Sequence, residues 1–248
     1  MSFLCRQCNY SFETKVKFCS QCGASVAITT TTKKIKNVNI IISFYVAMLV
    51  FIVSAYYVDI TFPFNLEAEL IVEIGFACIV IGFASLDLQP ILKLYSFKTI
   101  KLKLIVFSII TPIVTSLFVY FFIEFINYVF LLSNDTNYYQ SYLYLDYPLF
   151  WAIVFIAILP PIIEELAFRG VLFNQLQKVT SNKVTIIATA FLFALIHFSI
   201  LSFLWIFPFG LLLGYLRSRY STLWLGIIIH FIHNLSIVLL DYYNFYAF

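Results

Sequence analysis

Seven apolar segments follow one another between residue 38 and residue 240 of this 248-residue chain. Each is roughly long enough to cross the hydrocarbon core of a bilayer as a helix, which takes about 20 residues. The composition agrees, because 11% of the residues are charged, whereas a soluble domain carries about 25%. We therefore expect an all-α fold, a polytopic transmembrane helical bundle of about seven spans, with an error of one because the fifth and sixth segments are short and adjacent. The expected spans are residues 38–58, 70–86, 102–123, 149–163, 184–199, 201–216 and 222–240.

The basic residues around these segments fall on alternate connections. They precede the first span and lie between the second and third, the fourth and fifth, and the sixth and seventh: Lys33, Lys34, Lys36, Lys93, Lys98, Lys101, Lys103, Lys178, Lys183, Arg217 and Arg219. The other connections and the end of the chain carry acidic residues instead: Asp59, Glu67, Glu69, Asp135, Asp146 and Asp241. Because loops rich in Lys and Arg stay in the cytoplasm, we expect a multi-pass protein of the cell membrane with a cytoplasmic N-terminus.

Two Cys-x2-Cys pairs lie near the N-terminus, Cys5 with Cys8 and Cys19 with Cys22. Four thiolates at this spacing can converge on one tetrahedral zinc ion, and Gly23 allows a tight turn after the second pair. Disulfides or a redox pair are the alternatives, which the absence of a surrounding βαβ pattern disfavours. A stretch of about 25 residues cannot bury a core of its own, so a metal would supply the folding energy. We expect residues 1–27 to form a zinc ribbon that holds a structural zinc ion.

The chain thus divides into a ribbon, a polar linker at residues 28–37 and a transmembrane helical domain at residues 38–248. The start of the chain is basic, which raises the question of nucleic-acid binding. However, Lys33, Lys34 and Lys36 stand directly before the first span, where they serve as a topology anchor. We therefore expect no nucleic-acid partner, and we expect the ribbon to suit a cytoplasmic protein partner or to recruit the substrate.

Residues 159–170 place Glu164, Glu165 and Arg169 inside a run that otherwise belongs in lipid. An ionised side chain at bilayer depth costs on the order of 3 kcal/mol even on lenient scales. On a helix, Glu165 and Arg169 are four residues apart and share a face that suits an ion pair, whereas Glu164 lies about 100° around the helix. The plain interpretation is one structural salt bridge and a spare carboxylate. The functional interpretation is that Glu164 belongs to a site.

All three histidines also lie in the expected spans, His197 in the fifth, and His230 and His233 in the seventh. Counted from the nearest basic loop at about 1.5 Å per residue, Glu164, His197 and His230 lie about 16–21 Å into the membrane. His230 and Asn234 are four residues apart and share a helix face, and His233 lies about 60° off that face. We expect Glu164, His197, His230 and Asn234 to meet in one polar pocket. We expect His233 to be packed and hydrogen-bonded.

Such a pocket supports two kinds of chemistry. A carboxylate can act as a general base on water while imidazole and amide groups stabilise an oxyanion. Alternatively, Glu164, His197 and His230 can hold a catalytic zinc ion with an open position for water. The chain has no His-Glu-x-x-His or Gly-x-Ser-x-Gly motif, so neither a soluble-type zinc protease nor a serine protease is supported. A proton-coupled transporter is a further alternative, although the paired, interrupted half-repeats typical of transporters are missing from the sequence.

Three short motifs, in this order, are similar to those of the CAAX-protease and bacteriocin-processing (CPBP, or Abi) family of intramembrane endopeptidases. They are Glu164-Glu165-x3-Arg169, Phe193-x3-His197 and His230-x3-Asn234. The resemblance implies a protease core at about residues 148–240 that hydrolyses a membrane-associated peptide or protein. The substrate classes it implies are a CAAX-type tail, a leader or signal peptide, and a pheromone or bacteriocin precursor. A proteolytically inactive scaffold or regulator of the same family is the alternative.

The resemblance also implies a role for each motif residue. The first glutamate and the second motif's histidine would activate water, the third motif would form the oxyanion hole, and the remaining charged pair would support them. The family leaves open whether a catalytic metal takes part. Carried over to this chain, Glu164 and His197 activate water, His230 and Asn234 form the oxyanion hole, and Glu165 and Arg169 are supporting residues.

Overall fold

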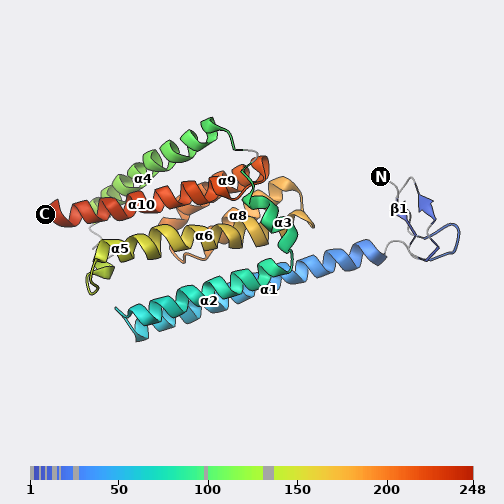
Figure 1. Cartoon of the computed structure of the whole chain (residues 1–248), viewed down its shortest axis with the longest axis horizontal. Helices are drawn as coiled ribbons and strands as arrows, with labels where there is room; N and C mark the ends of the chain where they lie inside the picture. Colours follow the sequence, from blue (N-terminus) through green and yellow to red (C-terminus); the bar gives the residue numbers. More distant parts are fainter. Residues whose placement is uncertain are drawn as a thin grey trace.

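The computed structural model describes residues 3–5, 7, 8, 10–12, 16, 18–24, 28–97, 100–130 and 137–247. Long helices lie roughly side by side in a bundle, and a small N-terminal unit lies beyond one end of it (Figure 1). The N-terminal unit contains the strands β1 (Phe3–Leu4) and β2 (Ser11–Phe12). The helices are α1 (Ile28–Thr61), α2 (Leu66–Ser85), α3 (Leu88–Leu92), η1 (Lys93–Tyr95), α4 (Leu102–Phe130), η2 (Gln140–Tyr142), α5 (Pro148–Ala152), η3 (Ile153–Ile158), α6 (Leu159–Glu165), η4 (Leu166–Leu172), α7 (Phe173–Gln177), α8 (Asn182–Leu195), α9 (Ile200–Tyr220) and α10 (Trp224–Ala247).

Six helical runs are long and apolar enough to cross a membrane in the described part of the chain. They are Lys34–Thr61 within α1, α2, α4, the continuous run from α5 to α7, α9, and Trp224–Asn244 within α10. The remaining expected segment is α8, whose 14 residues reach only about 21 Å at 1.5 Å per residue. The all-α transmembrane bundle is therefore confirmed, with six full-length spans and one short apolar helix.

The connections between the helices are sorted between the two ends of the bundle. The α1–α2 loop, the start of α5 and the C-terminal end of α10 lie at the left end in Figure 1. The N-terminal strands, α3 and the α9–α10 link lie at the right end. This is the separation that the alternating loop charges predict, although Lys98 and Asp135 lie outside the described residues. The cytoplasmic placement of the right end stays a prediction.

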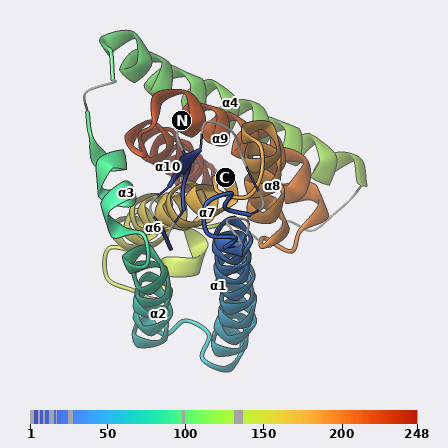
Figure 2. The ribbon, with the colours of Figure 1, turned by 90° about the vertical axis from the view of Figure 1, so that its right-hand side faces the viewer.

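The helices that surround the site are packed closely through small residues. Seen along the bundle, α1 and α2 form a pair on one side and α4 crosses the opposite side, with the other long helices between them (Figure 2). A Cβ on Gly210 would come 3.1 Å from the Cα of Ala190, and one on Gly214 would come 3.3 Å from the Ile186 side chain. Helices in lipid associate mainly through such close packing, so these two glycines fix the α8–α9 hairpin.

The span from Pro148 to Gln177 is one helical run in which two π-helical segments interrupt the α-helix. η3 and η4 are π-helical segments, and they bracket α6, which carries both glutamates. Pro160 and Pro161 lie between η3 and those glutamates, and neither has a backbone N–H. The carbonyl of Ile156 is therefore left without a donor at either the fourth or the fifth following residue. π-helical segments such as η3 and η4 often occur at functional sites in helices.

The N-terminal unit has the shape expected of a small ribbon. β1 and β2 pair in antiparallel fashion, with Phe3 opposite Phe12. Gly23 has a φ of 70°, a left-handed conformation that glycine adopts without strain, so the expected turn after the second cysteine pair is present. Residues 28–37, which the sequence suggested as a polar linker, form the start of helix α1.

Candidate active site

Three parts of the bundle bring the candidate site residues together. Glu164 and Glu165 lie on α6, His197 lies in the turn after α8, and His230 and Asn234 lie on α10. α10 packs against both η3 and α6, and α8 packs against η4. Residues that are far apart in the sequence are thereby placed around one part of the bundle interior.

The expected ion pair is present at the centre of this region. Nη1 of Arg169 donates to Oε1 of Glu165 at 2.8 Å, and both side chains are fully buried. Nη2 of Arg169 also donates to the carbonyl of Gly210 at 3.3 Å, and the guanidinium lies 4.4 Å from the centroid of the Phe193 ring. A buried ion pair persists only when such additional contacts offset the loss of hydration. The pair therefore ties η4 to α8 and α9.

Gly226 provides the space that the Glu165 carboxylate occupies. A Cβ at this position would overlap with Oε2 of Glu165, so any larger residue would have to displace the carboxylate. Gly226 precedes His230 by one turn of α10, so the same helix face makes room for one site residue and presents the next. None of the three sequence motifs includes this glycine.

His230 lies between the two adjacent glutamates. Its Nε2 is 3.9 Å from Oε2 of Glu164, and its Nδ1 is 3.6 Å from Oε1 of Glu165. Both distances exceed a hydrogen bond but place the imidazole in direct electrostatic contact with both carboxylates. Glu165 is fully buried and already paired, whereas Glu164 keeps part of its side chain accessible. The two neighbouring glutamates therefore have different environments, as the helix geometry predicted.

His197 borders the same region from the end of α8. Its Nδ1 is 2.9 Å from the carbonyl of Phe193, and its side chain is exposed. When Nδ1 donates to that carbonyl, Nε2 keeps its lone pair for a water or a substrate. The Phe193 ring contacts both histidines, at 5.1 Å from the ring centroid of His197 and 5.9 Å from that of His230. Phe193 thus separates them while lying over Arg169.

Asn234 has a structural contact that the sequence did not reveal. Its Nδ2 donates to the carbonyl of Ile156 at 2.9 Å, which is the carbonyl that Pro160 and Pro161 leave without a helical donor. One N–H of the amide therefore completes the hydrogen bonding of the fourth span, and the other is available to a ligand. Asn234 holds α10 against the irregular segment that precedes Glu164.

His233 is packed and hydrogen-bonded, as expected. Nε1 of Trp205 donates to its Nε2 at 3.3 Å, and the two rings are stacked with centroids 5.3 Å apart. Phe209 lies against the same imidazole, at 5.0 Å between ring centroids. The ring is buried and has its own partners, so His233 is distinct from the motif residues one turn away.

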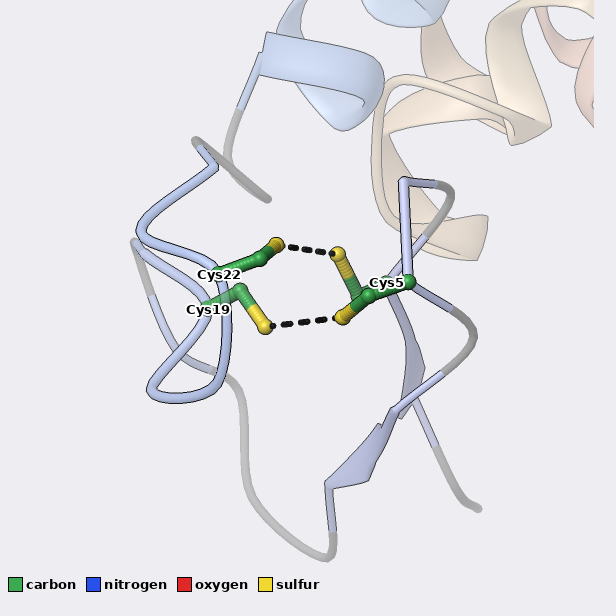
Figure 3. A group of neighbouring side chains, drawn as sticks. Cys5, Cys19 and Cys22 are labelled. Carbon is green, nitrogen blue, oxygen red and sulfur yellow. Dashed lines mark hydrogen bonds between the residues drawn. The ribbon is translucent and has the colours of Figure 1, made fainter.

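The four ribbon cysteines form a candidate metal centre. Their sulfur atoms all lie within 4.8 Å of one another, with Cys5 and Cys22 at 3.6 Å and Cys8 and Cys19 at 3.5 Å (Figure 3). Tetrahedral zinc with Zn–S bonds of about 2.3 Å requires sulfur atoms about 3.8 Å apart, whereas a disulfide needs about 2.05 Å. All four thiols are free. The residues present therefore fit a bound metal ion such as zinc.

The candidate site residues in the membrane do not converge in the same way. Among the described residues, the cysteine quartet is the group of His, Cys, Asp and Glu side chains whose ligand atoms come within 4.8 Å of one another. Glu164, His197 and His230 do not form such a group in this conformation. We therefore derive no catalytic step through a metal.

Glu73, on α2, is a further intramembrane carboxylate near Glu164. It lies outside all three motifs, although a glutamate inside an apolar segment can be recognised from the sequence as a candidate functional residue.

Comparison with known proteins agrees with the position of the site. Residues 146–236 match the family model described as "Type II CAAX prenyl endopeptidase Rce1-like". No curated protein and no solved structure matches the chain. The matched segment runs from just before α5 into α10 and contains all three motifs, and it lies close to the expected core of residues 148–240. Over residues 146–236, the membrane-embedded part of this chain is therefore similar to the Rce1-like CAAX prenyl endopeptidase family.

Proposed function

We propose that this protein is an intramembrane endopeptidase that hydrolyses a peptide bond in a membrane-associated peptide or protein by means of water activated by Glu164. The observation that carries the proposal is the partly accessible Glu164 beside His230, above a fully buried Glu165–Arg169 pair. A structural salt bridge alone does not require a second, unpaired carboxylate inside the bilayer, where ionised groups are expensive. The substrate classes are a CAAX-type tail, a leader or signal peptide, and a pheromone or bacteriocin precursor.

In the proposed reaction, Glu164 and His197 handle the attacking water. Glu164 removes a proton from the water as its oxygen attacks the carbonyl carbon of the scissile bond. Nε2 of His197, whose other ring nitrogen is held by the Phe193 carbonyl, accepts a hydrogen bond from the same water. When the C–N bond breaks, the proton held by Glu164 passes to the departing amine, so that one water is consumed and the glutamate is restored.

His230 and Asn234 stabilise the oxyanion of the tetrahedral intermediate. Nδ1 of His230 faces Glu165 and its Nε2 lies on the side of Glu164, so an N–H at Nε2 can donate to the oxyanion. The amide of Asn234 has one N–H bound to Ile156 and a second one free. Donors fixed in place before the reaction are effective because they need no reorganisation as charge develops.

The Glu165–Arg169 pair positions these groups without touching the substrate. Glu165 contacts His230 on one side and Arg169 on the other, and Arg169 in turn is anchored on α8 and α9 through Phe193 and Gly210. This arrangement fixes the imidazole ring relative to Glu164. Positioning of this kind matters because a misplacement of about 1 Å can reduce a rate by about 10²-fold.

We further propose that the cysteine quartet holds zinc and that the ribbon lies on the cytoplasmic side of the cell membrane, where it binds a cytoplasmic protein or recruits the substrate. Four free thiols at tetrahedral spacing suit a reducing compartment, because disulfides form mainly in oxidising ones. The basic connections at the same end of the bundle support this orientation. Cysteine labelling of loop positions in intact cells tests it.

The decisive experiment compares Glu164→Gln with Glu67→Gln. The first keeps the shape and hydrogen bonding of the side chain but removes the base, so turnover per mole of folded protein should fall by about 10²–10⁴-fold. Glu67 is exposed at the end of α2, and its substitution should leave turnover unchanged. The substrate is found by comparing peptides that accumulate uncleaved in cells with the Glu164→Ala protein. Full turnover in Glu164→Gln would refute the mechanism.

A further inference from the structure

Helix α2 has an inward face that begins with two carboxylates. Val80 is buried in the main apolar cluster, whereas Ile71 and Ile74 are 69% and 60% exposed and face the lipid. Steps of three and four residues carry the inward face from Val80 back to Glu73 and then to Glu69. α2 packs along this face against α6 and η4, the segments that hold the proposed catalytic base.

Glu73 lacks the partners that a buried carboxylate requires. Its Oε2 is buried without a hydrogen-bond partner, and none of the ion pairs found among the described residues involves it. Its electrostatic neighbours are two other carboxylates, Glu164 and Glu69. A polar oxygen in this setting is stabilised by water when the protein supplies no donor. Structural ion pairing, which explains Glu165, does not explain Glu73.

A cleft lies at the end of the bundle that carries the α1–α2 loop and reaches Glu69, one helical turn before Glu73. It has a volume of about 520 Å³, and Asp59, Glu69, Val72 and Tyr142 are among its lining residues. The Tyr142 hydroxyl donates to the Glu69 carboxylate, so Glu69 is fixed in the cleft wall. Glu73 follows one helical turn deeper. Along α2, Glu69 in the cleft wall is followed by Glu73, whose electrostatic neighbour on the other side is Glu164.

We propose that Glu73 is a positioning residue through which water reaches Glu164, along a polar path that begins at the cleft and passes Glu69. Each peptide bond cleaved consumes one water, and Glu73 is the electrostatic neighbour of the base on the α2 side. Glu73 touches neither substrate nor reacting atoms; it holds a water by its unpartnered oxygen, next to the base. This inference rests on the proposed function for its consequence, but the path itself is open to a separate test.

The first test measures water directly and needs no proteolysis. In full-length, zinc-loaded protein with Cys78 replaced by Ala, one further cysteine is placed in turn at Glu69, Glu73, Ile71 or Ile74. Its reaction with a charged methanethiosulfonate reagent is measured over the background of the four ribbon cysteines in the parent protein. Such reagents react with thiolates, which form only in contact with water, so Glu69→Cys and Glu73→Cys should react at least about tenfold faster than the other two. Equal, slow reaction at Glu73→Cys and Ile74→Cys would overturn the proposal.

The second test separates the path from mere structure by kinetics. Glu73→Leu fills the position with an apolar side chain suited to the span and should lower kcat by about tenfold or more, with KM changed less than about twofold. Glu73→Gln still binds water through its amide and should keep most of the turnover, as should the exposed control Glu67→Gln. Unchanged kcat in Glu73→Leu, or an equal loss in both Glu73 variants, would overturn the proposal.

The two tests also distinguish this inference from the proposed function. If Glu164→Gln is fully active while Glu73→Cys is labelled, the water path exists but the proteolytic mechanism is wrong. If Glu164→Gln is inactive while Glu73→Cys resists labelling, the mechanism stands and the path is refuted. Kinetic constants are compared per mole of folded protein, and for a variant that accumulates poorly the labelling rate alone decides whether water reaches Glu73.

Discussion

The N-terminal ribbon and the membrane site both gather polar side chains, but they do so by opposite means. The ribbon has little more than a short strand pair and a small cluster around Cys5, Phe12 and Cys19, and its four thiols come together because they suit one metal ion. The membrane site is held by packed helices, with the motif residues Arg169 and Phe193 fully buried. We therefore expect the ribbon to depend on a bound metal ion and the membrane site to depend on its packed neighbours.

This difference predicts where each region is vulnerable. The ribbon should lose its structure when the metal is removed and should tolerate surface changes. The membrane site should be insensitive to loss of the ribbon's metal but sensitive to any change that leaves a buried charge or donor unpaired. Metal removal and single substitutions therefore test the difference between the two regions.

Removal of the ribbon metal should have the largest effect. Binding of zinc to four cysteines contributes about 10–16 kcal/mol in small metal-dependent folds, far more than this strand pair can supply. We expect one zinc ion per chain, and we expect chelation to make residues 1–27 of the full-length protein protease-sensitive while α1–α10 stay protected. The measurement is metal content together with limited proteolysis. A ribbon that stays protected in chelator, or a stoichiometry other than one, would contradict the assignment.

The same centre should respond to acid. The backbone N–H of Cys8 donates to the Cys5 sulfur and, with the other hydrogen bonds there, lowers the pKa of the Cys5 thiol to about 6. The Cys5 thiolate is therefore lost as the pH falls through about 6, whereas the pKa values of the Cys8 and Cys22 thiols are raised. Protons thus compete with the metal at Cys8 and Cys22 already at neutral pH, and metal affinity should fall further below about pH 6, where Cys5 is protonated too. Cys5→Ser removes the ligand and should abolish tight binding at any pH. Metal content measured across a pH series checks both expectations.

Breaking the buried ion pair should have the next largest effect. Glu165→Ala leaves the fully buried Arg169 without its carboxylate, which typically destabilises a protein by about 3–5 kcal/mol. We expect poor accumulation of this variant, and partial recovery when Arg169→Ala is added, because the double variant has no stranded charge. Quantitative detection of membrane-inserted protein is the measurement. An additive loss in the double variant would show that the two residues are not coupled.

Loss of the Asn234 amide should have a smaller effect with two separable parts. Asn234→Ala leaves the Ile156 carbonyl without a donor, at a cost of about 1–3 kcal/mol in stability, and it removes an oxyanion donor worth about 10²–10³-fold in kcat. Pro160→Ala restores a backbone N–H four residues after Ile156, so the stability loss should shrink in the double variant while the kcat loss remains. Thermal unfolding in detergent and turnover measure the two parts. If Pro160→Ala leaves the stability loss unchanged, the hydrogen bond from Asn234 to the Ile156 carbonyl does not stabilise the fold.

Much of this architecture was readable from the sequence for local reasons. Apolar segments of sufficient length dictate the spans, and the spacing of Glu165 and Arg169 dictates a shared helix face, because both depend only on helix geometry. The spacing of the cysteine pairs likewise predicted their convergence. α8 proved shorter than a full span because its turn already begins at Ile196, within the apolar run, so hydropathy alone overestimated its length.

The rest could not be predicted because it depends on which helices meet. The prolines showed that Ile156 would lack a donor, but only packing of α10 against η3 shows that Asn234 supplies it. Gly226 gains its meaning from the carboxylate that lies where its Cβ would be. Glu73 was visible as a carboxylate in an apolar segment, yet its neighbour Glu164 is about 90 positions away in the sequence, and no periodicity connects them.

The smallest effect is expected at His233, which lies between the motif residues His230 and Asn234 in the sequence and is easily mistaken for one of them. Its Nε2 accepts a hydrogen bond from Trp205, and its ring stacks between aromatic neighbours. His233→Phe keeps the stacking and removes one acceptor, so stability should fall by about 1 kcal/mol and kcat should stay within about twofold. The matched change His230→Phe, four-residue partner of Asn234, should instead abolish turnover because it removes a group in contact with both glutamates. Turnover per mole of folded protein compares the two. An equal loss in both variants would mean that the site extends to the Trp205 side of α10, and the contrast between packed and reactive histidines would fail.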